Sequence, residues 1–290
     1  MEAQLNVKTG YKRRKRIETF LYHVICILFA VTAMYPILWM ISSSLKESSS
    51  VFINASSLIP KGWHFENYVN GWQGFGGISF ATFFTNTIII TLSCVLGTII
   101  SNPLIAYGFS RLNFKGKNFW FATIMIALML PGQIVIIPQY IMFNSIGWVN
   151  TFLPLIVPAF FGNAFFIFQH MQFIRSIPRS LDEAATIDGC SKFRIYTNII
   201  FPLIKPSVIT SVIFQFYWTW DDFFTPLIYL TSPEKYTVSV ALKLFSDPHG
   251  MTDWGAMFAM GILAIIPPIL VFFIFQRYIV EGVSTQGLKG

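Results

Sequence analysis

Long apolar stretches alternate with short polar ones along most of this 290-residue chain. A helix needs roughly 20 apolar residues to cross the hydrocarbon core of a bilayer. Six stretches are long enough, near residues 20–43, 83–109, 119–143, 152–173, 207–230 and 257–276. The pattern therefore predicts an all-α integral membrane protein with six transmembrane helices.

Composition supports this class. The chain is 54% hydrophobic and 11% charged, with a mean hydropathy of +0.60, whereas soluble domains carry about 25% charged residues. Three scattered cysteines, Cys26, Cys94 and Cys190, form neither a disulfide framework nor a metal-site spacing. The G-x-x-x-x-G-K-[ST] pattern does not occur in the sequence, so no P-loop is predicted. We expect no catalytic residue, cofactor or metal in this chain.

The basic residues indicate the orientation. If the N-terminus is cytosolic, sixteen lysines and arginines fall on cytosolic segments and four on the outer ones. This is the positive-inside pattern, and it predicts that both termini are cytosolic. The same distribution explains the net charge of +7 without nucleic acid as a partner.

The N-terminal basic cluster, residues 12–16, precedes the first apolar stretch in the manner of a signal peptide. That stretch is too long for the hydrophobic region of a signal peptide, and no A-x-A cleavage site follows it. We interpret it as an uncleaved first span.

A long polar segment precedes the fifth span. Ser180 and Glu183 have the S-x-x-E spacing of a capping box, which predicts a helix start. Gly189 can end that helix with a positive φ. Ser191 can begin a second helix, which Pro202 and Pro206 limit. A helix pair in such a position could hold a soluble partner.

This segment resembles the EAA loop of the transmembrane subunits of bacterial ABC importers. It has the EAA triplet, the glycine four residues after the second alanine, and the later I-x-x-P element, with Phe201 where leucine is common. The residues that we assign to this loop are Glu183, Ala184, Ala185, Asp188, Gly189, Arg194 and Pro202. Further segments look like the carbohydrate-type permeases, namely 107–112, 114–117, 129–133, 137–138, 217–223 and 276–282.

The resemblance implies a type I ABC importer permease (MetI-like) fold with a cytosolic EAA coupling helix. It implies a basic arm and first span at 1–45, an extracytoplasmic loop at 46–79, a core at 80–280 with the EAA loop at about 174–206, and a cytosolic tail at 281–290.

The same resemblance implies the partners. The permease would form a heterodimer with a second, related permease in the bacterial cytoplasmic membrane. Two cytosolic ATPase subunits would bind ATP and Mg²⁺ and drive alternating access. An extracytoplasmic solute-binding protein would deliver a carbohydrate, above all an oligosaccharide.

Within the loop, the EAA helix would dock into a groove on the ATPase. Ala184 and Ala185 are small enough for two backbones to approach closely. Glu183 could cap its own helix or pair with a basic group of the partner. Asp188 and Arg194 would be surface or intraloop charges.

Four residues near the fifth span form a candidate substrate path: Trp218, Trp220, Asp221 and Asp222. Aromatic faces stack on sugar rings and carboxylates bind hydroxyls, and charge within a membrane marks a functional site by default. The aspartates could instead bridge helices or satisfy backbone donors.

Other functions remain as alternatives. The chain could be an ABC permease for a non-sugar solute. A stand-alone secondary carrier would need coupling carboxylates in its spans, and only the pair at 221–222 is present. An intramembrane enzyme would need H-E-x-x-H or aspartates on separate helices, and the sequence has neither arrangement.

Overall fold

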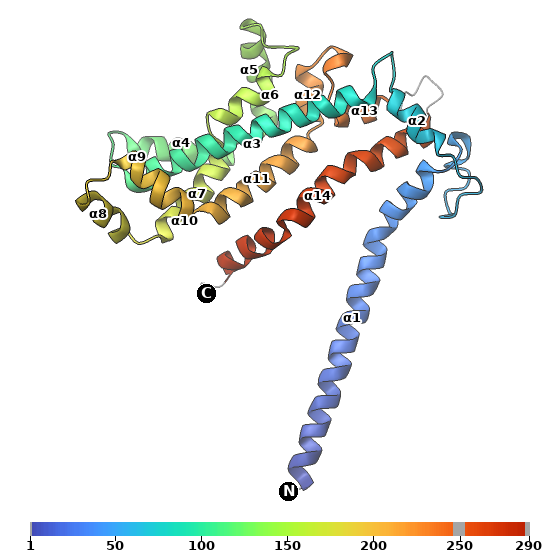
Figure 1. Cartoon of the computed structure of the whole chain (residues 1–290), viewed down its shortest axis with the longest axis horizontal. Coiled ribbons are helices and arrows are strands. Elements are labelled where there is room, and N and C mark those ends of the chain that lie inside the picture. The colour runs from blue at the N-terminus through green and yellow to red at the C-terminus, as the bar shows by residue number, and fades with distance from the viewer. Residues whose placement is uncertain (1, 246–252, 288–290) are drawn as a thin grey trace. The chain divides into compact units, whose positions relative to one another are not determined.

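Helices make up nearly all the regular structure of the chain. The computed structural model describes residues 2–245 and 253–287, so part of the predicted second outer loop and the last residues of the tail lie outside the described residues. The larger helices are α1 (Glu2–Ser44), α2 (Glu66–Gln73), α3 (Phe80–Arg111), α4 (Lys117–Met129), α5 (Gly132–Ser145), α7 (Ala164–Ser176), α8 (Ser180–Ile187), α11 (Lys205–Trp220) and α14 (Trp254–Gly287) (Figure 1). The short ones are α6 (Leu153–Ile156), α9 (Lys192–Ile195), α10 (Phe201–Leu203), α12 (Phe224–Tyr229) and α13 (Val238–Leu244).

The six predicted spans correspond to four continuous stretches and two bent helix pairs. The continuous ones are Lys15–Ser44, Phe80–Arg111, Leu153–Ser176 and Trp254–Tyr278. The bent pairs are α4 with α5, and Lys192–Leu203 with α11. Counting each pair as one span gives six, and the described residues form no β-strand, which confirms the all-α class.

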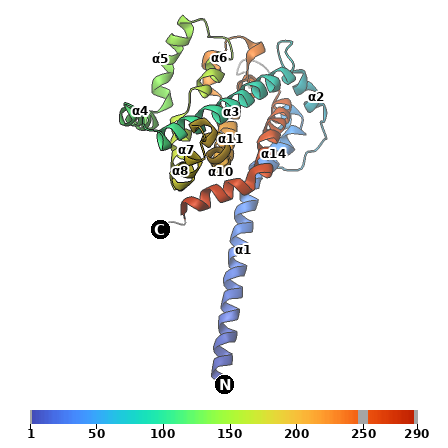
Figure 2. The ribbon, with the colours of Figure 1, turned by 60° about the vertical axis from the view of Figure 1, so that its left-hand side comes forward.

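Breaks in the spans follow local chemistry. The α4 and α5 axes differ by 107°, and Pro131, which lacks an N–H, stands between them (Figure 2). The second bent pair, which includes the predicted fifth span, bends by 75° at Ile204, just before Pro206. The sequence predicted one continuous span over residues 207–230. This prediction is wrong, because α11 ends at Trp220 and α12 forms a separate helix.

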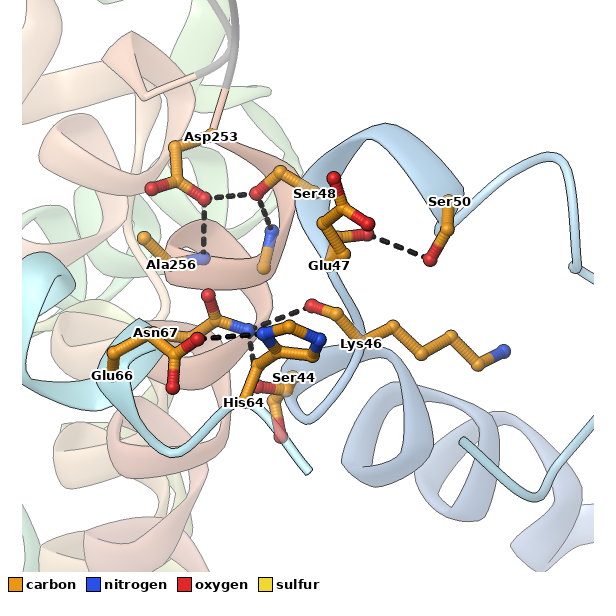
Figure 3. A network of polar contacts seen from close by, with 11 residues as sticks. Ser44, Lys46, Glu47, Ser48, Ser50, His64, Glu66, Asn67, Asp253 and Ala256 are labelled. Carbon is orange, nitrogen blue, oxygen red and sulfur yellow. Dashed lines mark hydrogen bonds and ion pairs between the residues drawn. The ribbon is translucent and has the colours of Figure 1, made fainter. Parts of the chain in front are cut away.

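The described chain divides into two compact units: residues 1–71 with 252–262, and residues 72–251 with 263–290. In the first unit a polar network joins the end of α1 to the start of α14 (Figure 3). The Asp253 carboxylate accepts bonds from the Ala256 N–H (3.0 Å) and the Ser48 hydroxyl. The contact between Ser48 and Asp253 places the segment after α1 beside the start of α14.

A buried lysine closes the loop after α1. Lys46 is 3% exposed, and its Nζ donates to the carbonyls of Asn54 (3.1 Å) and Ser57 (2.7 Å). Burial lowers the pKa of this ammonium group. Asn67 holds the same turn, since its Nδ2 donates to the carbonyls of Ser44 and Lys46, both at 2.8 Å. Sequence patterns alone had indicated no role for Lys46 beyond its contribution to the charge distribution.

Among the helices that lie wholly in the second unit, α3 is the longest, with 32 residues, and it packs against α7 and α11 (Figure 1). Gly97 allows a close approach: a Cβ there would lie 2.8 Å from Phe160 Cδ2 and 3.0 Å from the Ala159 carbonyl carbon. At Gly108, farther along α3, a Cβ would meet nothing within 4 Å. The close backbone approach therefore lies near Gly97, in the middle of α3.

Candidate functional site

The polar segment before the fifth span forms the predicted pair of helices. Gly189 has φ +78°, a backbone conformation that residues with a Cβ rarely adopt, and it follows Asp188, the C-cap residue of α8. Ser191 begins the second helix, because its hydroxyl accepts a bond from the Arg194 N–H (3.3 Å). Helix, glycine turn and capped second helix are confirmed.

The predicted capping box at the start of α8 does not form. The helix begins at Ser180 itself, after Arg179, and no side chain caps it. The chain turns one residue earlier than predicted, since the Arg179 carbonyl accepts from the N–H groups of Asp182 (2.9 Å) and Glu183 (3.1 Å). Ser180 is therefore inside the first turn, where its hydroxyl cannot act as the N-cap.

Instead, α8 is held by the end of α3, in an arrangement that we call the α3 clamp. Arg111 Nε lies 2.7 Å from Asp182 Oδ2, and the two side chains are 6% and 16% exposed. Arg111 Nη2 also donates to the Ile177 carbonyl (2.7 Å) just before α8. One helical turn earlier, the Tyr107 hydroxyl donates to the Lys192 carbonyl (3.0 Å) at the start of α9. Two side chains of one helix thus hold both arms of the loop.

Most of the predicted loop residues are available to a partner. Ala185 is 6% exposed and packs in the core with Ile195 and Ile200, so its small size serves the internal packing. Exposed residues of the predicted set are Glu183, Ala184, Asp188, Gly189, Arg194 and Pro202. Two exposed apolar side chains that the sequence reasoning missed stand beside them: Ile187 (87%) and Phe193 (66%). A groove of about 410 Å³ runs beside α8, between Glu183, Ile187 and Lys192 and the end of α3.

A second concave site lies near the opposite end of α3. It is a cavity of about 330 Å³ whose walls come from α3, α5, α6, α11, α12 and the segments between helices, including Gly162 and Asn163 just before α7. Of the predicted substrate path, Trp218 and Asp222 line this cavity. Trp218 stacks on Phe166 with ring centroids 5.1 Å apart. The Asp222 carboxylate accepts a bond from the Thr225 N–H (3.1 Å).

The other two predicted path residues do not line the cavity. Trp220 is 5% exposed, stacks on Phe216 and donates from Nε1 to the Ala264 carbonyl (3.1 Å). Asp221 is exposed at the end of α11, where its N–H bonds the Tyr217 carbonyl (3.0 Å). The structure therefore brings together one tryptophan and one aspartate of the four.

Polar side chains within the apolar stretches complete the cavity. Gln215 accepts from the Thr98 hydroxyl (3.1 Å) and donates to the Thr219 hydroxyl (2.7 Å). The Tyr229 side chain is 1% exposed and lines the cavity, and its hydroxyl has no partner among the described residues. Gln215 and Thr219 are four residues apart on one face of a helix, a signal that sequence reasoning could have used. Tyr229 carried no such signal.

These features define a polytopic membrane permease: bent spans around a polar cavity, and an exposed helix pair held to one span. The family model described as "Binding-protein-dependent transport system inner membrane component" matches residues 94–285. The chain belongs to this family, and it is a membrane permease of the ABC transporter class.

Curated relatives are similar over almost their full length. The probable ABC transporter permease protein YurM of Bacillus subtilis is 34% identical over 291 residues, which cover 100% of this chain and 95% of YurM. The arabinooligosaccharides transport system permease protein AraQ of Halalkalibacterium halodurans is 30% identical, with 90% and 93% covered. The trehalose/maltose transport system permease protein MalG of Thermococcus litoralis is 30% identical, with 96% and 99% covered.

A solved structure supports the fold. A chain of a bacterial ABC transporter involved in the import of the acidic polysaccharide alginate superposes with a TM-score of 0.80 at 24% identity, over 92% of this chain and 98% of that one. This likeness confirms the ABC importer permease (MetI-like) fold.

The α3 clamp generates a prediction. Replacing Asp182 by Asn leaves the Arg111 charge in a largely buried place, a change that costs on the order of 3 kcal/mol in buried ion pairs. We expect backbone amides of residues 178–189 to exchange with deuterium about a hundredfold faster. The control is Asp188→Asn, an exposed acid on the same segment, which should leave exchange unchanged. Equal exchange in both variants would show that the ion pair does not hold α8.

Proposed function

We propose that this permease carries a carbohydrate, above all an oligosaccharide, from an extracytoplasmic binding protein into the cytosol. The family supplies the class of transport, and several relatives bear names of sugar systems. The observation that carries the substrate class is the cavity, which is lined by Trp218 together with amide, hydroxyl and carboxylate side chains such as Gln215 and Asp222. Sugars offer both apolar ring faces and hydroxyls to such a lining.

The proposed assembly has this chain beside a second, related permease, with two cytosolic ATPase subunits that bind ATP and Mg²⁺. The α8–α9 loop would contact an ATPase, and both termini would be cytosolic. In support, α8 presents Ile187 and α9 presents Phe193, large apolar side chains that a soluble partner could cover. Glu183 beside them could pair with a basic group of that partner.

The mechanism follows from how the loop is held. Because the α3 clamp ties both arms of the loop to one helix, a displacement of α8 by the ATPase would move the end of α3. Side chains nearer the other end of α3, Thr87 and Cys94 among them, line the cavity. ATP-driven closure of the ATPases could therefore alter the cavity without a separate linkage.

Purification of the assembly tests this proposal. The chain would be isolated from gently solubilised membranes of its own cells, and the co-purifying proteins identified by mass spectrometry. A second permease, a P-loop ATPase and a solute-binding protein are the expected partners. Sugar transport by the chain alone, in liposomes without an ATPase, would instead favour the secondary carrier.

The positive φ of Gly189 predicts a pair of unequal substitutions. A non-glycine residue in this conformation costs about 1–2 kcal/mol, while asparagine tolerates it and β-branched residues do not. Since a Cβ at Gly189 meets nothing within 4 Å, only the backbone is strained. In proteoliposomes with the assembled complex, Gly189→Val should reduce ATP-driven uptake several-fold more than Gly189→Asn. Equal uptake by the two variants would show that the backbone conformation at Gly189 does not contribute to transport.

Two adjacent aspartates allow a matched test of the cavity. Asp222→Asn replaces a charge-assisted bond to a hydroxyl by a neutral bond about half as strong, which should raise the KM for the sugar about five- to tenfold. Asp221→Asn, on the neighbouring residue outside the cavity, should leave KM unchanged. Uptake of radiolabelled sugar over a range of concentrations measures both. A larger effect at Asp221 would be incompatible with the cavity as the solute path.

A further inference from the structure

A third cavity, which we call the basic pocket, lies where the end of α3, the start of α4 and the end of α7 meet. It measures about 520 Å³, and four cationic side chains line it: Arg111, Lys117, Arg175 and Arg179. The basic pocket as a whole is not part of the candidate solute path or of the exposed face of the coupling loop. A gathering of like charges in a cavity favours an anion.

Only one of these four charges has an acidic partner among the described residues. Arg111 pairs with Asp182 in the α3 clamp. Lys117 Nζ donates to the Leu112 carbonyl (2.8 Å), and the Arg175 guanidinium lies 5.7 Å from the centroid of the Phe121 ring. These contacts position the two cations but leave their charge uncompensated. Three positive charges therefore remain for a ligand.

The surroundings of the basic pocket indicate what kind of anion it takes. Helix α4 starts at Lys117 and has no buried side chain in the part of the chain that the structure describes. Phe119 and Trp120, in its first turn, are 68% and 54% exposed. Aromatic side chains favour the headgroup level of a bilayer. A cationic cavity at the start of an apolar, aromatic-rich helix is therefore suited to an anion that is joined to hydrocarbon chains.

We propose that the basic pocket binds the phosphate headgroup of an anionic phospholipid, with its acyl chains along α4. Lysine and arginine recognise phosphate through charge-assisted bonds, and arginine can do so with two parallel ones. Basic pockets between spans on the cytosolic side are suited to such headgroups. This site is separate from the solute cavity. The proposed orientation of the chain decides only which leaflet of the bilayer supplies the lipid.

Native mass spectrometry of the purified full-length protein, with whatever subunits co-purify, tests the site. Dioleoylphosphatidylglycerol and dioleoylphosphatidylcholine would be titrated in separate samples. We expect the anionic lipid to bind at least about tenfold more tightly. The triple variant Lys117→Gln, Arg175→Gln, Arg179→Gln should lose that preference.

A second triple variant provides the control. Lys115→Gln, Arg194→Gln and Lys205→Gln remove the same charge from exposed positions that do not line the pocket, and they should keep the preference. A charge-preserving variant, Arg175→Lys with Arg179→Lys, should also keep it. Because this variant changes two of the same three positions and keeps their charge, it distinguishes a folding defect at those positions from a loss of lipid binding.

Four results would overturn the proposal. Both lipids could bind equally, or the control could lose the preference as fully as the pocket variant, which would indicate general surface charge. Inorganic phosphate could displace the lipid at equal concentration, which would indicate a soluble anion site. Finally, an acidic segment of a co-purifying protein could be cross-linked to Lys117, which would indicate a protein contact. Since none of these measurements involves sugar, failure here leaves the transport proposal intact.

Discussion

The ion pair between Arg111 and Asp182 is the interaction on which the arrangement of the candidate site depends. Its two atoms are 2.7 Å apart, and its side chains are largely removed from solvent. A buried pair of this kind adds little net stability compared with an apolar pair, yet the loss of one partner is costly. The pair therefore fixes where α8 lies relative to α3 more than it stabilises the fold. The Tyr107 contact to the start of α9 makes the attachment two-sided.

The length of α3 connects this attachment to the solute cavity. A helix of 32 residues is about 48 Å long, so α3 reaches from the cavity region to the coupling loop as one element. Pro103 lies inside it, but the helix continues past that residue. Gly97 brings its middle into contact with the Ala159–Phe160 backbone and ring, and Asn102 accepts a bond from the Asn163 N–H (2.6 Å). A helix fixed at its middle and end transmits displacement better than a flexible loop would.

Sequence patterns predicted the elements better than their contacts. Six spans, the Gly189 turn and the Ser191 cap follow from hydropathy and from local backbone chemistry, which neighbouring residues determine. The start of α8 was wrong by one residue because the S-x-x-E spacing is local, whereas the real restraint on α8 comes from Arg111, far away in the sequence. Likewise, the sequence offered four residues near the fifth span as equal candidates for the substrate path. Because α11 ends at Trp220, only Trp218 and Asp222 line the cavity. Tyr229 and Gln139 join them through tertiary packing, which no short spacing encodes.

The central claim is that α8 is the contact between this permease and an ATPase. A photo-cross-linking amino acid placed at Ile187, which is 87% exposed on α8, tests it in native membranes. Ile53, 81% exposed in the predicted outer loop, provides the matched control. The account predicts an adduct with a P-loop ATPase from position 187 and none from position 53. An ATPase adduct at position 53, or its absence at position 187 in membranes that contain the assembled transporter, would contradict it.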